Sequence, residues 1–346
     1  MSNKFFKIKT TVMKSNSFLK AACLAIAAIF FTSLDLHAQS SAPVNGQTSS
    51  PAQLVDALHA AFGQHHARAV HAKGIILEGT FTPSSAAATL SKAFHLQKKS
   101  SKVTVRFSDF TGIPDIPDNI GLANPRGLAI KFQADDGSTT DIVTHSFDGF
   151  PTENSDQFRE LLLAISTSGA TAAKPTDLDK FLDTHPVAKT FLTTQKNPVS
   201  YGTISYFGVN SFKFTNSKGN AHIIRYQFIP ENGEQLLSAE EMAKAAPDYL
   251  QSEIKTRIAK HSIKFKMYAQ VSEDDDQTGN PSIAWPVTRT KILLGTIEIK
   301  KLADNTADGD KALSFSPNNI PDGIETADPM LNFRSKAYPI SVSGRQ

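Results

Sequence analysis

Apolar and polar positions alternate over much of this chain, which predicts an extensive β-sheet flanked by helices. Helical spacing begins at Pro51, a residue that favours the first turn of a helix. The clearest alternation runs from Ile263 to Val271. Shorter alternating segments are expected at 75–81, 103–107, 128–132, 141–144, 201–214, 222–228 and 292–299. Further helices are expected at 156–166, 177–192, 238–260 with a break at Pro247, and in the segment that carries Tyr338.

Most of these strands are joined by short connections. Asp136-Gly137 predicts the turn between two of them, and residues 216–219 the turn of a second hairpin. At least seven such strands indicate one closed antiparallel β-barrel with helices outside it, an α+β fold. No internal repeat or second composition regime is evident, so residues 51–346 are expected to form one domain.

The N-terminal segment has the pattern of a secretory signal peptide. Five lysines (Lys4, Lys7, Lys9, Lys14 and Lys20) precede an apolar run from Ala21 to Leu34. Residues 1–38 are therefore expected to be removed, and the Ser/Gln/Pro-rich residues 39–50 to form a flexible leader. Export predicts a periplasmic protein in a Gram-negative host, without a membrane span.

Charge and cysteine content exclude several classes of function. The signal contributes five Lys and one Asp, so the whole-chain charge of +3 falls to about −1 after cleavage. A near-neutral mature chain gives no support to nucleic-acid binding. The single cysteine, Cys23, lies inside the signal, so disulfides, thiolate ligands and cysteine nucleophiles are all excluded from the mature protein.

Arg334 and Tyr338 form the most informative pair of residues. Their i,i+4 spacing places both on one face of the C-terminal helix. A guanidinium beside a phenol favours the phenolate, because an opposite charge lowers the pKa of an acid. A phenolate is a hard anionic ligand that suits ferric iron, although the pair alone is common on surface helices.

A second group of polar residues lies at the start of the sheet. Arg68 and His71 stand where the first helix gives way to the first strand, and Arg106 and Ser108 end the next strand. An imidazole there can act as a general acid and base, and a hydroxyl can fix its tautomer. Taken alone, the segment with His71 is better explained by a buried histidine in a strand, and the segment with Arg106 and Ser108 is nearly uninformative.

Together the motifs resemble those of the haem catalase family, from about residue 51 to the C-terminus. The matching segments are Arg68–His71, Val105–Ser108, Pro125–Phe132, Trp285-Pro286, Phe315–Pro321, and Arg334–Tyr338 with Arg345 seven residues later. The resemblance implies a catalase-like barrel with a C-terminal proximal haem helix.

The same resemblance implies haem b and a role for each matching residue. His71 would be the distal acid/base and Ser108 its partner, while Tyr338 would ligate the iron as a phenolate stabilised by Arg334. The phenolate is expected to reach the metal at the heart of the barrel. The remaining assignments are propionate binding by Arg68, Arg106 and Arg345, porphyrin stacking by Phe150, and lining of the proximal pocket by Met330.

Two departures from full catalases favour a related branch of exported, short peroxidases. Ser146, or His145 after a small shift, takes the place of a distal Asn that is expected to orient a second peroxide. The chain also stops shortly after Tyr338, which implies no later helical domain and no NADPH site. We therefore expect reduction of hydrogen peroxide or organic peroxides by a small organic electron donor.

Three alternatives remain open at this stage. One is true catalase activity, and another is chemistry on fatty-acid hydroperoxides, against which Val70 argues because such branches carry Thr before the distal histidine. The third is a non-catalytic exported barrel that binds haem or an apolar ligand. A monomer or small homo-oligomer is expected.

Overall fold

A computed structural model describes residues 48–304 and 306–345. The expected signal peptide and all but the last residues of the leader therefore lie outside the described residues. The helices are α1 (Pro51–Phe62), α2 (Ala87–Leu90), α3 (Ser155–Thr167), α4 (Asp177–Thr184), α5 (Pro186–Thr193), α6 (Ala239–Lys244), α7 (Tyr249–Ile258), α8 (Thr306–Ala312) and α9 (Pro329–Ser343). The expected helix starts at Pro51 and Ser238 are confirmed, and each begins with a capping box.

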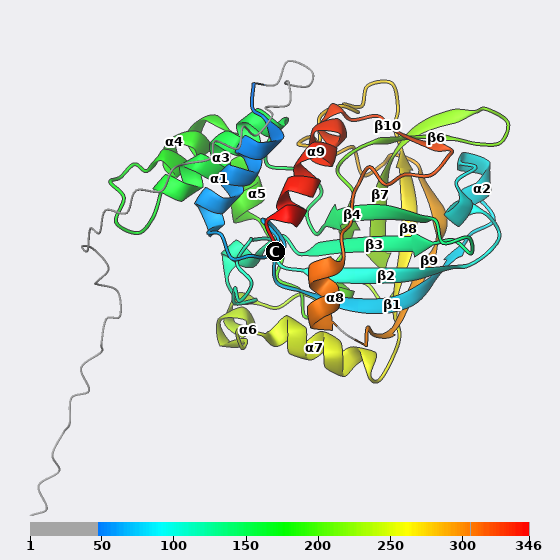
Figure 1. Cartoon of the computed structure of the whole chain (residues 1–346), viewed down its shortest axis with the longest axis horizontal. Coiled ribbons are helices and arrows are strands. Elements are labelled where there is room, and N and C mark those ends of the chain that lie inside the picture. Colours follow the sequence, from blue (N-terminus) through cyan, green and yellow to red (C-terminus); the bar gives the residue numbers. More distant parts are fainter. Residues whose placement is uncertain (1–47, 305, 346) are drawn as a thin grey trace, which may run out of the picture. The chain divides into compact units, whose positions relative to one another are not determined.

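The strands form one antiparallel sheet that closes on itself (Figure 1). They are β1 (Gly74–Pro83), β2 (Ser101–Ser108), β3 (Gly127–Gln133), β4 (Thr139–His145), β5 (Tyr206–Phe207), β6 (Phe212–Thr215), β7 (Ala221–Pro230), β8 (Ile263–Val271), β9 (Lys291–Leu302) and β10 (Ile324–Thr326). Hydrogen bonding runs in the order β7-β5-β4-β3-β2-β1-β9-β8, and pairing of β8 with β7 completes the ring. The predicted closed barrel with surrounding helices is confirmed.

Alternation along the strands separates an apolar interior from a mixed exterior. On β2, Val103, Val105 and Phe107 point into the barrel core, so Arg106 and Ser108 face outward. The interior is packed with buried aromatic rings. They include Phe81, Phe107, Phe132, Phe214, Phe228 and Phe265. Side chains thus fill the barrel, as is usual for a small barrel of this strand number.

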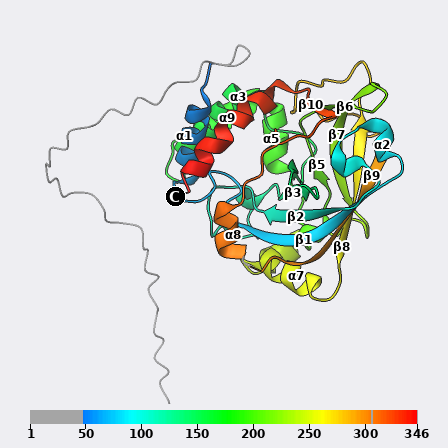
Figure 2. The same ribbon diagram turned by 45° about the vertical axis from the view of Figure 1, so that its right-hand side comes forward.

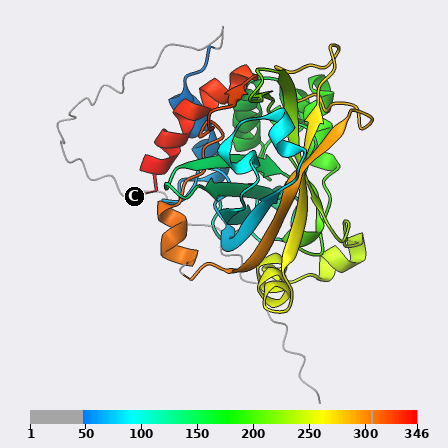
Figure 3. The same cartoon turned by 90° about the vertical axis from the view of Figure 1, so that its right-hand side faces the viewer.

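A second apolar cluster joins the helices beside the barrel. It contains Leu54, Leu58 and Phe62 of α1, Leu162 of α3, and Phe333 and Ala337 of α9. Figures 1 and 2 show α1, α3 and α9 side by side, next to one end of strands β2, β3 and β4. Helices α6 and α7 cover a different part of the barrel, below the strands (Figure 3). The space between the α1–α9 layer and the outer barrel wall is where the polar motifs meet.

Two expectations about local structure are wrong. The helix predicted for 177–192 is divided at His185, because Pro186 starts α5 and cannot donate a backbone hydrogen bond to α4. The strand predicted for 201–214 is a 3-10 turn and two short strands, β5 and β6. Helices α2 and α8 and strand β10 were not predicted. No helix among the described residues has the length and apolar character needed to cross a membrane.

Candidate active site

A cavity of about 200 Å³ lies between the outer face of the barrel and the helix layer. Its walls come from β2, β3 and β4 on one side and from α1, α3 and α9 on the other. The apolar lining consists of Leu54, Val55, Leu58, Val70, Ala129, Val143, Phe150, Phe158, Val209, Phe315, Phe333 and Ala337. The expectation of a site at the heart of the barrel is therefore wrong, because core side chains fill the interior and the polar motifs project outward.

The last residue of β2, the first residue of β3 and the last residue of β4 form one row on this outer wall. Ser108 of β2 is paired with Gly127 of β3, and Gly127 is paired with His145 of β4. Directly opposed residues point to the same face of an antiparallel sheet. Gly127 must be a glycine, because a Cβ there would lie 2.4 Å from Ser108 Oγ and 2.8 Å from His71 Nδ1.

His71 is held in the left-handed region of backbone space, with φ of 58°. Such a conformation is uncommon for a residue with a side chain and is concentrated at functional sites. The backbone N–H of His71 donates to Phe110 O at 2.8 Å, and Arg106 Nη1 donates to His71 O at 2.9 Å. These two bonds fix the imidazole over the cavity, where Phe110 meets it edge to face at 5.6 Å.

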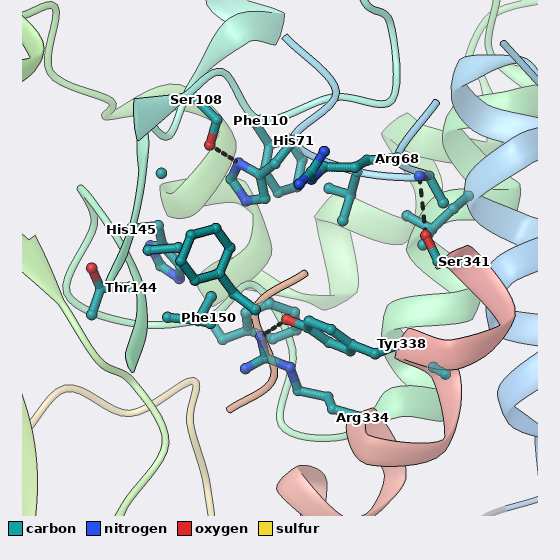
Figure 4. Close-up of a pocket in the computed structure, with 18 of the residues that line it drawn as sticks. Arg68, His71, Ser108, Phe110, Thr144, His145, Phe150, Arg334, Tyr338 and Ser341 are labelled. Atoms are coloured by element: carbon teal, nitrogen blue, oxygen red, sulfur yellow. Dashed lines mark hydrogen bonds between the residues drawn. The ribbon is translucent and has the colours of Figure 1, made fainter. Parts of the chain in front are cut away.

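The imidazole of His71 is a neutral group with one hydroxyl partner. Its Nδ1 lies 3.1 Å from Ser108 Oγ (Figure 4). Burial, and after it the positive charge of Arg106 and the nearby His145, lowers the pKa of His71 to about 3. The ring is therefore uncharged near neutral pH, and Nε2 is free to exchange a proton with a molecule in the cavity.

Tyr338 enters the cavity from α9, on the side away from His71 (Figure 4). Arg334 Nη2 donates to Tyr338 Oη at 2.6 Å, and Arg334 Nη1 donates to Asn210 Oδ1 at 2.6 Å. Asn210 in turn donates to Asp328, the residue that caps the N-terminus of α9. This chain of polar groups holds the guanidinium against the phenol oxygen, as the i,i+4 spacing predicted.

Arg68, Arg106 and Arg345 line another part of the same cavity. Arg106 Nε lies 2.5 Å and Arg68 Nη1 lies 3.1 Å from the carboxylate of Asp310 on α8. Among the side chains that the structure describes, Asp310 is the only carboxylate that forms an ion pair with any of these arginines, and it pairs with Arg68 and Arg106. Burial, and after it the positive charge of Arg106, lowers the pKa of Arg68 to about 9. Three guanidinium groups beside one carboxylate leave the cluster with excess positive charge.

The remaining predicted residues also line the cavity. Phe150 packs against Phe158 with ring centroids 4.8 Å apart, and Met330 is buried at the start of α9. Of the two candidates for the distal amide position, His145 lines the cavity. The side chain of Ser146 is buried and accepts a hydrogen bond from the Arg126 backbone at 2.9 Å.

Sequence reasoning missed Asp310, Gly127 and Asn210. Asp310 lies in a helix without a clear apolar repeat, and Asn210 lies in the break between β5 and β6. Gly127 does belong to the Pro125–Phe132 motif, so its importance could have been inferred once Ser108 was assigned to the neighbouring strand.

The comparisons with known proteins agree with this geometry. A family model described as Catalase matches residues 52–345. The chain belongs to the catalase family. This catalase-family protein is 34% identical over 302 residues to a "Catalase-related peroxidase" of Mycolicibacterium paratuberculosis, covering 86% of this chain and 95% of that relative. It is 30% identical to a protein of the same description from Synechococcus elongatus, covering 86% of this chain and 88% of the relative.

Full-length catalases match less of their own length. A "Catalase" of Vibrio vulnificus is 29% identical over 290 residues, which cover 78% of this chain but 56% of that protein. The solved structure of a fungal catalase superposes with a TM-score of 0.71 at 22% identity, covering 81% of this chain and 59% of the other. A bacterial catalase structure gives a TM-score of 0.70. The structural likeness establishes the fold.

Catalases generally bind haem, and the residues of this catalase-family protein fit that group. The cavity walls are apolar, as a porphyrin requires, and a phenol oxygen and an imidazole enter from opposite sides. Three guanidinium groups with one carboxylate leave two positive charges unmatched among the described residues, which equals the charge of two propionates. Tyr338 would supply an oxygen ligand to the iron, and Arg68, Arg106 and Arg345 would hold the propionates.

Proposed function

We propose that this protein is a haem b peroxidase that reduces hydrogen peroxide or organic hydroperoxides at the expense of a small organic electron donor. The observation that carries the proposal is the pairing of a neutral, serine-bound imidazole with an arginine-bound phenol across one apolar cavity. Both relatives described as catalase-related peroxidases are matched over most of their length, which supports the same assignment.

His71 would move the proton of the peroxide. With Nδ1–H donating to Ser108 Oγ, Nε2 presents a lone pair that takes the proton from one peroxide oxygen and returns it to the oxygen that leaves. Haem, when bound, supplies the redox chemistry that accompanies cleavage of the O–O bond. The balanced reaction consumes one hydroperoxide and two donor molecules, and it yields an alcohol or water, a further water and two donor radicals.

Arg334 and the residues behind it would hold the phenol oxygen of Tyr338 in its anionic form. The guanidinium donates to the phenol oxygen, and its other end is anchored through Asn210 to Asp328. An anionic oxygen from Tyr338 would be a hard ligand for the haem iron. Arg68, Arg106 and Arg345 would orient the porphyrin by charge-assisted hydrogen bonds to its carboxylates.

True catalase activity is the alternative that the comparisons favour next, because a "Catalase" from Vibrio vulnificus matches 78% of this chain. Stopped-flow mixing of the haem-loaded protein with hydrogen peroxide separates the two activities. A peroxidase is expected to oxidise a phenolic donor much faster than it evolves oxygen, whereas a catalase shows the reverse. A protein whose haem spectrum does not change with peroxide would contradict both.

A non-catalytic carrier is less well supported. Carriers of the lipocalin type hold their ligand inside the barrel, but the interior of this barrel is packed with side chains. Replacing His71 by Ala distinguishes the two functions. A carrier keeps its haem affinity, while a peroxidase loses about 10²–10⁴-fold in rate.

Export to the periplasm, as a monomer or small homo-oligomer, completes the proposal. The support is the basic and apolar pattern of residues 1–38. Expression of the full chain in a Gram-negative host, followed by N-terminal sequencing of the periplasmic product, tests it. A mature N-terminus near Gln39 is expected, and retention of the intact chain in the cytoplasm would contradict export.

A further inference from the structure

A second hollow, with no lining residue in common with the cavity, lies at the start of β1. It has a volume of about 430 Å³, and its walls come from residues 72–75, from Pro114, from Gln251 and Lys255 of α7, and from Asp310 of α8. Figures 1 and 2 show α7 and α8 close to β1. A hollow of this size can hold one substituted aromatic ring. The proposed reaction does not yet use it.

The hollow and the cavity lie on opposite sides of Arg106. Arg106 lines the cavity, and its Nη2 donates at 3.0 Å to the carbonyl oxygen of Ala72, which lines the hollow. Nε and Nη2 of the same guanidinium also donate to the carboxylate of Asp310. A Cβ on Gly74 would lie 2.4 Å from the guanidinium. This layer of backbone and guanidinium therefore stands between the hollow and the place where Arg106 would hold a propionate.

The cavity is better suited to haem than to an aromatic donor. Its volume is about 200 Å³, and its apolar lining is the surface that fits a porphyrin. Once haem is bound there, an aromatic donor has to give up its electron from outside the cavity. Electron transfer requires no direct contact and can cross a single layer of side chains. The hollow behind Arg106 is placed for such a transfer to the propionate edge.

Two side chains of α7 offer polar groups to the hollow. Gln251 and Lys255 are four residues apart, so they lie on the same face of the helix. Lys255 is exposed and takes part in no ion pair within the described part of the chain. The ammonium of Lys73, by contrast, is already bound by Asp118 at 2.6 Å and by Asp248 at 2.7 Å. Lys255 is therefore the cation that can pair with an acidic ligand.

These groups indicate the chemical class of the ligand. The ammonium of Lys255 matches a carboxylate, and the amide of Gln251 can bind a hydroxyl group as donor or acceptor. Pro114 is exposed beside them and offers an apolar surface to a ring. A phenol that carries a carboxylate has all three features.

We propose that this hollow binds the electron donor, and that the donor is a phenol with an acidic substituent that pairs with Lys255. The inference rests on the proposed peroxidase function and names its reductant. Each donor loses one electron and its hydroxyl proton, and it leaves as a phenoxyl radical. Two donors thus supply the two electrons and two protons that convert one hydroperoxide to an alcohol or water and a further water.

Binding without turnover gives the first test. Isothermal titration of the haem-loaded ferric protein, without peroxide, measures the Kd of 4-hydroxyphenylacetate and of 4-methylphenol, which lacks the carboxylate. Lys255→Glu should raise the Kd of 4-hydroxyphenylacetate about tenfold and keep that of 4-methylphenol within about twofold, because attraction to a unit charge becomes repulsion. Lys255→Arg should bind both probes as wild type does. Lys260→Glu makes the same charge change beyond the end of α7, outside the hollow, and should alter neither Kd.

Gln251→Trp gives a second test, because the larger ring fills the hollow and should weaken the binding of both phenols. In peroxide-dependent oxidation, the KM of each phenol should change in parallel with its Kd. Three results would overturn the inference: no binding of either phenol to wild type, equal losses of both phenols in Lys255→Glu, or wild-type affinities in Lys255→Glu and Gln251→Trp. If wild type still oxidises phenols with peroxide, the peroxidase function survives these results. Lys255-dependent binding by a protein that oxidises neither phenol would support the site and defeat the proposed function.

Discussion

Asp310 and Arg106 form a two-point ion pair at the edge of the cavity. Arg106 Nε and Nη2 donate to Asp310 Oδ1 and Oδ2 at 2.5 and 3.0 Å, and Arg68 donates to the same carboxylate. Two of the three arginines that would hold propionates therefore already bind a carboxylate of the chain. Gly74 permits this arrangement, because a Cβ there would lie 2.4 Å from the Arg106 guanidinium.

Asp310→Asn is expected to tighten haem binding. The amide removes a negative charge that repels the propionates and competes for the same guanidinium groups, so a gain of about three- to tenfold in affinity is reasonable for one partly buried charge. Titration of the apoprotein with haem, followed by absorbance, measures it. Asp322→Asn, at an exposed ion pair with Lys92, is the control. Weaker binding in Asp310→Asn would instead show that the carboxylate orients the arginines.

Gly127→Ala is expected to damage the distal side while leaving the haem in place. The new methyl group would lie 2.4 Å from Ser108 Oγ and 2.9 Å from His71 Cε1, so the Ser108–His71 contact must break. We expect at least a tenfold loss in the rate of peroxide reduction with unchanged haem content. Gly169→Ala is a matched control, because a Cβ there meets nothing within 4 Å. A fully active Gly127→Ala would contradict the assignment of this row.

Tyr338→Phe removes the oxygen that would bind iron. The expected result is loss of the phenolate vibrations from the resonance Raman spectrum and a large drop in haem retention during gel filtration. Arg334→Lys keeps the positive charge but cannot donate to Tyr338 and Asn210 together, as the guanidinium does. It should therefore give an intermediate spectrum. Tyr268→Phe, on strand β8 outside the cavity lining, should change neither measurement.

Acidification is expected to destabilise the apoprotein through its buried histidines. His95 lies among Phe81, Phe94 and Phe132, neither of its ring nitrogens has a partner among the described residues, and burial lowers its pKa to about 3. Because the folded-state pKa is below the unfolded value of about 6.5, the unfolded chain binds more protons as pH falls from 6.5 toward 3. Stability is therefore retained above pH 6.5 and lost below it, by about 2 kcal/mol per such histidine between pH 7 and pH 5.

His95→Leu isolates that contribution. Urea unfolding at pH 7 and pH 5 should show that this variant loses about 2 kcal/mol less on acidification than wild type. His222→Gln, at an exposed position of β7, should leave the difference between the two pH values unchanged. An identical acid response in His95→Leu and wild type would show that His95 is protonated in the folded protein.

Much of the site could be predicted because its chemistry is encoded in short motifs. His71 with Ser108, and Arg334 with Tyr338, are brought together as the spacing and the family resemblance implied. The location of the cavity could not be predicted from motifs alone. Alternation on β2 does place Arg106 and Ser108 opposite the apolar residues, but only the packed barrel core shows that the outward face carries the site.

Contacts between distant segments were harder to predict. Asp310 approaches Arg106 across 204 positions of sequence, and α8 has no apolar repeat that would have marked it. The choice between His145 and Ser146 depended on the register of β3 and β4, since a shift of one residue exchanges the two faces of a strand. Local patterns cannot fix a register when both residues are polar.

The row formed by Ser108, Gly127 and His145 makes the chemistry inseparable from barrel assembly. Each of the three residues comes from a different strand, so a slip of one residue in either pairing would turn a member of the row toward the core. A misassembled barrel would consequently not react with peroxide, even if it still bound haem. The ratio of peroxide reactivity to bound haem is thus a sensitive gauge of correct strand alignment in any preparation of this protein.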